Sequence, residues 1–320
     1  MKAAVYYENG PPSVLKYEDV PDPVSQPQSI IIKVEAVSIE GGDTLNRLGG
    51  ALTGHPHIVG YQAAGTIIDV GSEVKNFKLG QKVVTVNAFG SHAELRSVFA
   101  LTAWPIPEGF DIKQAAAMPV PFGTADDCLF EFGRLKAGET VLVQAGASAV
   151  GLAAIQLAKR TGATVIATAS SEEKLARLKP FGMDHGIDYV RKDLVAEVMR
   201  ITDNKGVDLV VDPVGGPTLQ KSLLSLGYRG RVSSVGDAGR EKDKLDVSSL
   251  RTGNRSLRGV FLGAEIISDR VRNMIQRHID EAAQGKLKVV IDKTFPLRDA
   301  AAAHAYIESR KAFGRVLLIP

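Results

Sequence analysis

Cysteine is almost absent from this chain. Cys128 is the single cysteine among 320 residues, so no disulfide can form within the chain and no thiolate-rich metal site can be built. Long apolar runs are lacking too, since no stretch approaches the roughly 18 uncharged apolar residues that a membrane helix needs. Both absences favour a protein of a reducing compartment that does not span a membrane.

An excess of one charge is also missing. The chain has 39 Lys and Arg against 36 Asp and Glu, a formal net charge of +3, with no dense basic block and no basic stripe interleaved with aromatics. We therefore expect no nucleic-acid partner. Residues 1–7 predict a first strand followed by a turn rather than a signal peptide, which makes a cytoplasmic protein the default expectation.

The first third of the chain is rich in short β signals. Residues 29–37, 63–70 and 82–86 are rich in apolar and β-branched residues and bounded by glycine, proline or polar turn residues. Helical periodicity is sparse before an alanine-rich helix at residues 112–118. The pattern predicts a β-rich, partly closed domain in a chain long enough for two domains.

From about residue 140 the pattern alternates between strand and helix. Expected strands cover residues 140–144, 164–169, 207–211, 231–235 and 257–262, and expected helices cover residues 150–160 and 172–179. Such alternation indicates an α/β fold with a doubly wound parallel sheet. The tail predicts helices at residues 271–284 and 299–309 and strands at residues 289–295 and 315–319. We expect it to pack back on the first domain, which makes the alternating part an insertion.

A turn of small residues joins the first strand of the alternating part to its helix. It reads Gly146-x-Ser148-x-x-Gly151, a dinucleotide-binding template without its middle glycine. Small residues let the backbone N–H groups of a helix N-terminus approach a pyrophosphate. Strand-to-helix turns also use small residues for packing alone, but the order strand, turn, helix, strand favours a dinucleotide.

The end of the second strand distinguishes between cofactors. NAD sites place an acidic residue there, whereas residues 168–171 read Thr-Ala-Ser-Ser, and Lys174 follows Ser170 by four positions. Hydroxyls and a lysine suit a 2′-phosphate, so NADPH is favoured over NADH. The alternative is that Ser170 or Ser171 caps the next helix; capping and phosphate binding are compatible.

With these patterns established, the chain resembles the zinc-independent quinone oxidoreductases, the zeta-crystallin-like branch of the medium-chain dehydrogenase/reductase superfamily. The similarity covers essentially the whole chain. Its motifs lie at residues 10–15, 64–65, 70–74, 151–159, 206–208 and 314–320.

The resemblance implies a Rossmann domain (residues 120–262) inserted in a β-rich GroES-like catalytic domain (residues 1–119 plus 263–320), with a cleft between them. It also implies a homodimer formed through strand 257–262, unless that strand is covered by its own chain. The implied cofactor residues are Thr124 facing the cofactor; Ser148, Ala149 and Val150 at the pyrophosphate; Ser170, Lys174 and Tyr189 around the 2′-phosphate; and Phe261, Leu262 and Arg310 at the nicotinamide half or clamping the cofactor. Tyr189 has an alternative interpretation as an ordinary half-buried tyrosine, and Arg310 as a helix-end cation.

Departures from the family pattern concern zinc and charge. Zinc-dependent relatives have a catalytic cysteine, a Gly-His-Glu segment and a four-cysteine lobe, whereas this chain has Glu40 nearby, Tyr61-Gln62 in the second segment and no cysteine lobe. His55 and His57 lack a third ligand of suitable spacing, so we expect no metal site. Many relatives have Asn at Glu40, an aromatic residue at Leu45 and glycine at Ala149, so substrate preference is expected to differ.

These features predict a zinc-free reductase that uses NADPH to deliver hydride to a quinone or another electron-poor carbonyl or alkene. The enzymatic alternative is an enone or enoyl-thioester reductase; the alternative of another class is a non-enzymatic NADPH-binding structural or RNA-binding protein. Tyr61 is the candidate proton donor, with pocket packing as its alternative. Glu40 and Asp43 are pocket candidates, with hydrogen bonding to turns or cofactor as the favoured role of both, and Glu40 is expected beside the cofactor.

Overall fold

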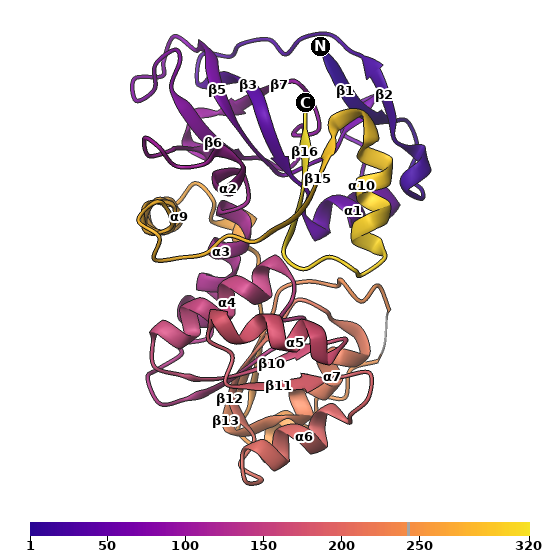
Figure 1. Ribbon diagram of the computed structural model, residues 1–320, viewed down its shortest axis with the longest axis vertical. Coiled ribbons are helices and arrows are strands. Elements are labelled where there is room, and N and C mark those ends of the chain that lie inside the picture. The colour runs from indigo at the N-terminus through magenta and orange to yellow at the C-terminus, as the bar shows by residue number, and fades with distance from the viewer. Residues whose placement is uncertain (242–243) are drawn as a thin grey trace. The chain divides into compact units, whose positions relative to one another are not determined.

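The computed structural model describes residues 1–241 and 244–320 and divides the chain into two compact units. Unit 1 consists of Met1–Val120 and Gly263–Pro320, so both ends of the chain belong to it; unit 2 is Pro121–Leu262. Figure 1 follows the chain from one unit into the other and back by its colour. Each unit is described by itself below.

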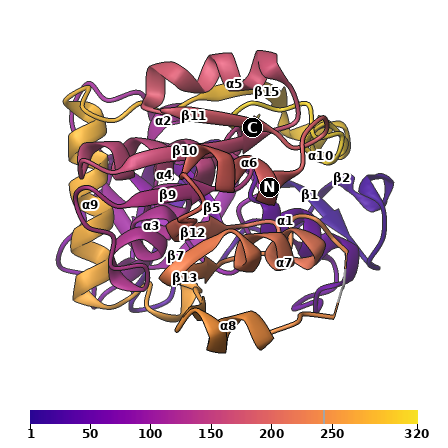
Figure 2. The same ribbon diagram turned by 90° about the horizontal axis from the view of Figure 1, so that it is seen from below.

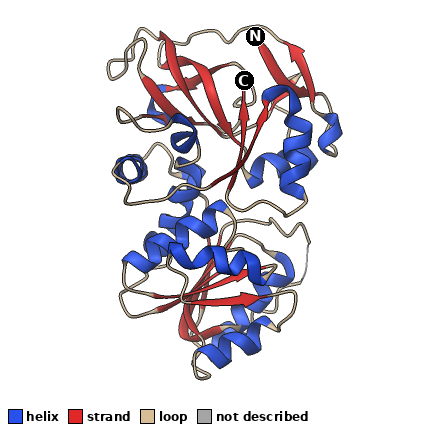
Figure 3. Cartoon of the chain, viewed as in Figure 1, coloured by secondary structure: helices blue, strands red, loops and turns tan. Residues whose placement is uncertain are grey.

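Unit 1 is built on a seven-stranded sheet with the order β15-β16-β3-β5-β6-β8, in which β7 also pairs with β3. A smaller sheet has the order β2-β1-β4. All their pairings are antiparallel except that of β15 with β16. Figure 3 distinguishes the strands of the chain from its helices by colour. The strands are β1 (Lys2–Tyr6), β2 (Lys16–Asp19), β3 (Ser29–Ser38), β4 (His57–Ile58), β5 (Gln62–Val70), β6 (Lys82–Val86), β7 (Leu95–Phe99), β8 (Ala103–Pro105), β15 (Ile291–Pro296) and β16 (Arg315–Ile319).

The central strand of unit 1 is β3, which pairs with β5, β7 and β16. Its β-branched residues favour the extended conformation, and Ile30, Ile32 and Val34 are buried in the unit's core. Leu318 from β16 and Ala303 near the C-terminus belong to the same core. The last segments of the chain are therefore held by the first.

Helices cover parts of unit 1. They are α1 (Gly41–Gly49), α2 (Ile112–Ala116), the start of α3 (Pro119–Asp126), α9 (Asp269–Ala283) and α10 (Ala300–Glu308). Figure 1 shows α10 beside α1, and Arg47 of α1 forms a salt bridge with Glu308 of α10. The unit 1 residues of the candidate site lie on α1 and next to it.

Unit 2 contains a six-stranded sheet, parallel throughout, with the order β11-β10-β9-β12-β13-β14 (Figure 2). Its strands are β9 (Thr140–Val143), β10 (Thr164–Ala169), β11 (His185–Asp188), β12 (Val207–Asp212), β13 (Leu226–Ser234) and β14 (Ser256–Gly259). Its helices are the rest of α3, α4 (Ala149–Arg160), α5 (Glu172–Leu178), α6 (Leu194–Ile201), α7 (Gly216–Leu224) and α8 (Ser248–Thr252). The strand order reverses between β9 and β12, as in a doubly wound fold.

Alternate residues of these strands point to opposite faces of the sheet. Leu142 and Ile166 share one apolar cluster with Leu194 of α6 and Leu223 of α7. Their neighbours in the strands, such as Val141, are equally buried and point to the other face. Burial on both faces is typical of a parallel sheet and agrees with the doubly wound fold expected from the sequence.

Two expectations about elements need correction. The strand expected at residues 257–262 ends at Gly259, and a 3₁₀ helix spans Leu262–Ala264, because the chain leaves the sheet after Val260 donates its N–H to the Ser234 carbonyl. The helix expected at residues 112–118 stops at Ala116. Among the described residues no helix combines the length and apolarity needed to span a bilayer.

Candidate functional site

The turn between β9 and α4 is built from close backbone contacts. Gly146 donates its N–H to the Thr168 carbonyl at 2.8 Å, and the Ser148 hydroxyl caps α4 by accepting from the Gly151 N–H at 3.0 Å. A Cβ at Gly151 would lie 2.7 Å from Cα of Gly146, so only glycine lets the helix start this close to the strand. The amides of Ala149 and Val150, at the first two helical positions, have no acceptor within the helix.

A chain of polar side chains crosses the carboxyl edge of the unit 2 sheet. Thr168 donates to Gln144 Oε1 at 2.9 Å, Gln144 Nε2 donates to Ser222 at 3.1 Å, and Ser222 donates to Asp212 Oδ2 at 2.7 Å. These bonds connect the ends of β9, β10 and β12, the edge at which ligands of open α/β sheets bind. These hydrogen bonds were not predicted from the sequence, although Thr168, Gln144 and Asp212 all lie at or next to strand ends.

The loop after β10 combines hydroxyls, a cation and a helix start. Ser171 is the N-cap of α5 and accepts from the Lys174 N–H at 3.3 Å, so Ser170, one residue earlier, does not fill that position. Tyr189 follows the neighbouring strand β11, donates its N–H to the Ala169 carbonyl at 3.2 Å and is 45% exposed. Ser170, Lys174 and Tyr189 therefore follow the ends of two adjacent parallel strands.

In unit 1, Glu40 lies buried directly before α1. Its carboxylate forms an ion pair with the Arg315 guanidinium from β16, and Gln62 Nε2 from β5 donates to Glu40 Oε1 at 2.6 Å. Arg315 also donates to the Ile39 carbonyl at 2.9 Å. Burial raises the pKa of Glu40, and the charge of Arg315 and its hydrogen bond act in the opposite direction. The extra negative charge expected at this position is thus neutralised inside the unit.

Asp43 holds two backbone segments together. It is fully buried, and its carboxylate accepts from the Glu40 N–H at 2.8 Å and from the Tyr61 N–H at 3.1 Å. Burial raises the pKa of Asp43 to about 8, and the hydrogen bond from the Glu40 backbone opposes this. The expected hydrogen bonding of Asp43 to turns is confirmed by these contacts.

The Tyr61 side chain is half-buried, immediately before β5. Asn46 Nδ2 of α1 donates to its hydroxyl oxygen at 3.1 Å. Burial raises the pKa of Tyr61 to about 12, so the phenol keeps its proton at neutral pH. The hydroxyl is therefore a neutral hydrogen-bond donor.

A histidine pair lies deep in unit 1. Nε2 of His92 and Nε2 of His304 from α10 are 3.0 Å apart, and both residues are fully buried. Burial lowers the pKa of both rings, that of His304 to about 3. The lowered pKa values favour two neutral rings at neutral pH, in which one Nε2 donates and the other accepts.

Comparison with known proteins covers both units. Residues 26–108 match the family described as alcohol dehydrogenase GroES-like domain, and residues 149–280 match the family described as zinc-binding dehydrogenase. A 2-haloacrylate reductase from a Burkholderia species is 32% identical over 99% of this chain and 98% of its own length. The quinone oxidoreductase of Rattus norvegicus is 32% identical over 100% of this chain and 98% of its own length.

Among solved structures, Escherichia coli quinone oxidoreductase complexed with NADPH matches with a TM-score of 0.95 and 29% identity, and the match covers 100% of both chains. This chain belongs to the zinc-independent quinone oxidoreductase branch of the medium-chain dehydrogenase/reductase superfamily. The resemblance derived from the sequence is confirmed, and so is the α/β fold with Rossmann and GroES-like parts. It is an enzyme of the quinone oxidoreductase type.

Unit 2 of this quinone oxidoreductase-type chain fits a phosphorylated dinucleotide. The close contact at Gly151 leaves the amides of Ala149 and Val150 at an uncharged helix start, where the dipole favours anions. The methyl of Ala149, where many relatives have glycine, is accommodated at the first helical position. No carboxylate occupies residues 168–171 at the end of β10, and Lys174 lies in the first turn of the following helix.

The remaining predicted cofactor residues lie on several separate elements of the two units. Thr124 is buried on α3, and Arg310 is an exposed residue with φ of +58° in the turn after α10 of unit 1. Phe261 is 75% exposed and Leu262 buried, both beyond the end of β14, which β12 and β13 separate from β9. Their roles toward the cofactor, like that of Glu40, stay predictions.

Metal ligands do not gather in the described part of the chain, where no group of three or more His, Cys, Asp or Glu side chains could hold an ion. His55 and His57 face different neighbours: the His55 ring packs edge-on against Tyr7, and the His57 ring against Tyr6. His57 Nδ1 lies 3.1 Å from the Thr53 hydroxyl.

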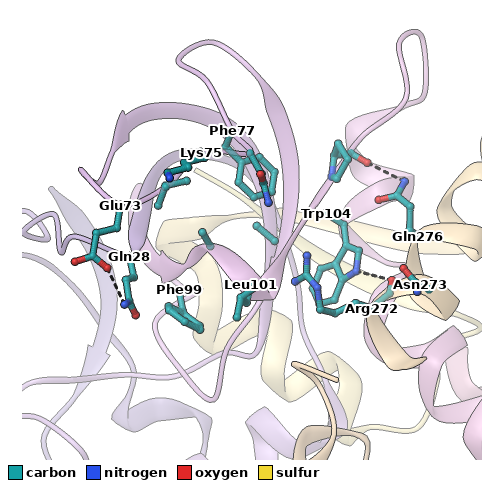
Figure 4. Close-up of a pocket in the computed structure, with 15 residues that line it drawn as sticks. Gln28, Glu73, Lys75, Phe77, Phe99, Leu101, Trp104, Arg272, Asn273 and Gln276 are labelled. Carbon is teal, nitrogen blue, oxygen red and sulfur yellow. Dashed lines mark hydrogen bonds between the residues drawn. The ribbon is translucent and has the colours of Figure 1, made fainter. Parts of the chain in front are cut away.

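A separate cavity of about 510 Å³ lies in unit 1 between the 73–77 loop, residues 99–105 and α9 (Figure 4). Trp104 forms part of its wall and donates Nε1–H to the Arg272 carbonyl at 3.0 Å, while Gln28 donates to Glu73 at 2.8 Å. None of the predicted site residues lines this cavity.

Proposed function

We propose that this chain is an NADPH-dependent, zinc-free reductase of quinones and other electron-poor carbonyl or alkene acceptors. The observation that carries the proposal is the carboxyl edge of the unit 2 sheet. There the amides of Ala149 and Val150 have no acceptor within α4, and Ser170, Lys174 and Tyr189 follow the ends of the neighbouring strands. The likeness to a quinone oxidoreductase complexed with NADPH supports the same cofactor.

The residues of unit 2 have distinct tasks in this proposal. The amides of Ala149 and Val150 bind the pyrophosphate, and the dipole of α4 favours its charge. Lys174, with Ser170 and Tyr189, binds the 2′-phosphate, which an acidic residue in their place would repel. When bound, the cofactor supplies a hydride equivalent.

The residues of unit 1 act on the acceptor. Tyr61 holds a proton at its phenol oxygen, and Arg315 and Gln62 satisfy the Glu40 carboxylate, so that Glu40 does not repel an electron-rich carbonyl oxygen. A quinone suits such a site because its reduced product is aromatic. An α,β-unsaturated carbonyl suits it because the developing enolate is delocalised, and the likeness to a 2-haloacrylate reductase favours this second candidate.

The test is NADPH oxidation by purified protein against quinones, enones, enoyl thioesters and simple aldehydes, with product identification. Hydroquinone formation supports the first candidate, and a saturated carbonyl product supports the second. Calorimetric NADPH binding without oxidation by any acceptor would leave a non-enzymatic NADPH-binding protein, and a gel shift with RNA would then test the RNA-binding alternative.

Lys174→Ala tests the cofactor assignment. Losing a charge-assisted contact to the 2′-phosphate costs about 1.5–3 kcal/mol, which is about a ten- to hundredfold rise in the dissociation constant for NADPH. NADH lacks this phosphate, so its binding should change little. Equal effects on both cofactors would remove Lys174 from the phosphate site.

Assembly and location are part of the same proposal. The edge strand β14 pairs only with β13 within the described residues, and we propose that two copies of the chain pair along it. Leu257→Pro would remove a backbone donor from that edge; light scattering should then report a monomer where the unmodified protein is a dimer. A cytoplasmic location completes the proposal.

A further inference from the structure

Two residues of α1, Gly42 and Asn46, contact the Tyr61 side chain. Asn46 Nδ2 donates to the phenol oxygen at 3.1 Å. A Cβ on Gly42 would lie 2.5 Å from Cε2 and 2.7 Å from Cζ of Tyr61, so the ring packs directly on the Gly42 backbone. Gly42 and Asn46 are four residues apart on α1 and share one helix face.

The backbone of Tyr61 is fixed as well. Its N–H donates to Asp43 at 3.1 Å, and its carbonyl accepts from Arg96 at 2.8 Å. Since Asp43 also belongs to α1, the main chain and the hydroxyl of Tyr61 are both tied to the same helix. Such two-point attachment restricts the rotation of the ring, which is what preorganises a donor.

The direction of the Asn46 bond determines what the phenol can do. A phenol has one proton to donate and lone pairs to accept with. An amide N–H fills a lone pair and leaves the proton available, whereas a carboxylate in the same place would take the proton for itself.

We propose that Asn46 is a positioning residue that, with Gly42, directs the Tyr61 proton toward the oxygen of the acceptor. This inference rests on the proposed reductase function and narrows its substrates to acceptors in which reduction places negative charge on an oxygen. When bound, NADPH would supply a hydride that forms a C–H bond on the acceptor while the conjugated π electrons move to the oxygen, leaving NADP⁺. Tyr61 donates a hydrogen bond to the resulting oxyanion. An enolate formed from an enone then takes a proton from water at its α carbon and becomes the saturated carbonyl. In a quinone the oxyanion takes its proton from water, and the ring carbon that received the hydride loses a proton to water while the second carbonyl oxygen gains one, which makes the ring aromatic.

A double-mutant cycle with Asn46→Leu and Tyr61→Phe tests the inference, with quinone and enone substrates at saturating NADPH. Tyr61→Phe should lower kcat about 10²-fold, the range measured for single oxyanion donors. Asn46→Leu should lower kcat about fivefold to tenfold, and adding it to Tyr61→Phe should cause no further loss. The dissociation constant for NADPH should stay unchanged in all variants.

Two further variants separate positioning from general damage. Asn46→Asp keeps the shape of the side chain but offers an acceptor, so it should lose more activity than Asn46→Leu. Asn273→Leu, at an exposed position of helix α9, is the matched control and should keep full activity. The proposal would be overturned if the double variant showed the product of the two single-variant losses of kcat, or if Asn46→Asp kept full activity.

A spectroscopic probe gives a readout without turnover. The absorption of 4-nitrophenolate shifts to shorter wavelength when its oxyanion accepts a hydrogen bond, so the probe should shift on binding to the unmodified protein. The shift should be smaller with Asn46→Leu and absent with Tyr61→Phe; no binding, or equal shifts, would contradict the inference. Failure of NADPH to bind the unmodified protein would instead refute the proposed function itself.

Discussion

The turn at the start of α4 and the cluster around Glu40 solve opposite electrostatic problems. The turn is made of backbone amides and the hydroxyls of Ser148 and Thr168, with no charged side chain in its hydrogen bonds. The cluster buries Glu40 and Arg315 against each other, with Asp43 nearby. The turn proposed to bind phosphate is left uncharged, while Glu40 and Arg315 in unit 1 are paired with each other within the chain.

The two regions also differ in how far apart in sequence their hydrogen-bonded residues lie. Glu40 and Arg315 are 275 residues apart in sequence, and Gln62 comes from a third element. The turn, by contrast, is joined by residues no more than 23 positions apart. Damage to the cluster should therefore loosen the whole of unit 1, whereas damage to the turn should stay local.

Arg315→Met should have the largest effect on stability among the substitutions that test this difference. It leaves the Glu40 carboxylate buried without its partner, and removing one member of a buried pair costs about 3–5 kcal/mol. The urea midpoint of unfolding, followed by circular dichroism, should fall accordingly. The double variant Glu40→Gln with Arg315→Met should recover part of the loss, because no unpaired charge remains.

The control for this prediction is an exposed pair of unit 2. Arg200 lies 3.0 Å from Glu197 on α6, and its side chain is 67% exposed. Arg200→Met should shift the midpoint little, because water and salt screen such pairs. A loss as large as that of Arg315→Met would mean that burial does not distinguish the two pairs.

The buried His92–His304 pair should make the stability of unit 1 depend on pH. Burial lowers the pKa of His304 to about 3, whereas a histidine in the unfolded chain has a pKa of about 6.5. Between these values the unfolded chain binds a proton that the folded chain does not, so stability is full above pH 6.5 and falls as the pH drops. The loss is about 1.4 kcal/mol per pH unit for each such histidine.

His304→Gln should therefore flatten the acid limb of a plot of unfolding free energy against pH by the contribution of one proton. His185→Gln, an exposed residue on β11, serves as the matched control and should follow the unmodified protein. An unchanged slope in His304→Gln would show that His304 takes up its proton in the folded state.

The same contrast explains what the sequence could predict. The strands at residues 82–86, 164–169 and 315–319 were predicted at their observed bounds, because β-branched and apolar residues bounded by turn signals are local patterns. The turn at Ser148 was predicted for the same reason. The doubly wound sheet followed from the alternation of these local signals.

Helix α1 and its contacts had no such signal. Glycines stand at both ends of α1 and are poor helix formers, so its helical state depends on tertiary contacts such as Asp43 with Tyr61. Glu40 and Tyr61 were identified as candidates, but Arg315, Asn46 and the His92–His304 pair were not assigned these contacts. Partners far apart in sequence leave no periodic trace within either segment.

Ser148→Ala gives the smallest expected effect. The hydroxyl caps α4 through the Gly151 N–H, and losing such a cap costs about 1 kcal/mol. Ser148→Gly should cost only a few tenths of that, because glycine is tolerated at this position. Since the hydroxyl is engaged with Gly151, NADPH affinity measured by calorimetry should change less in Ser148→Ala than in Lys174→Ala. A larger loss of affinity in Ser148→Ala would mean that the hydroxyl itself binds the pyrophosphate, and that the turn depends on a side chain as well as on its amides.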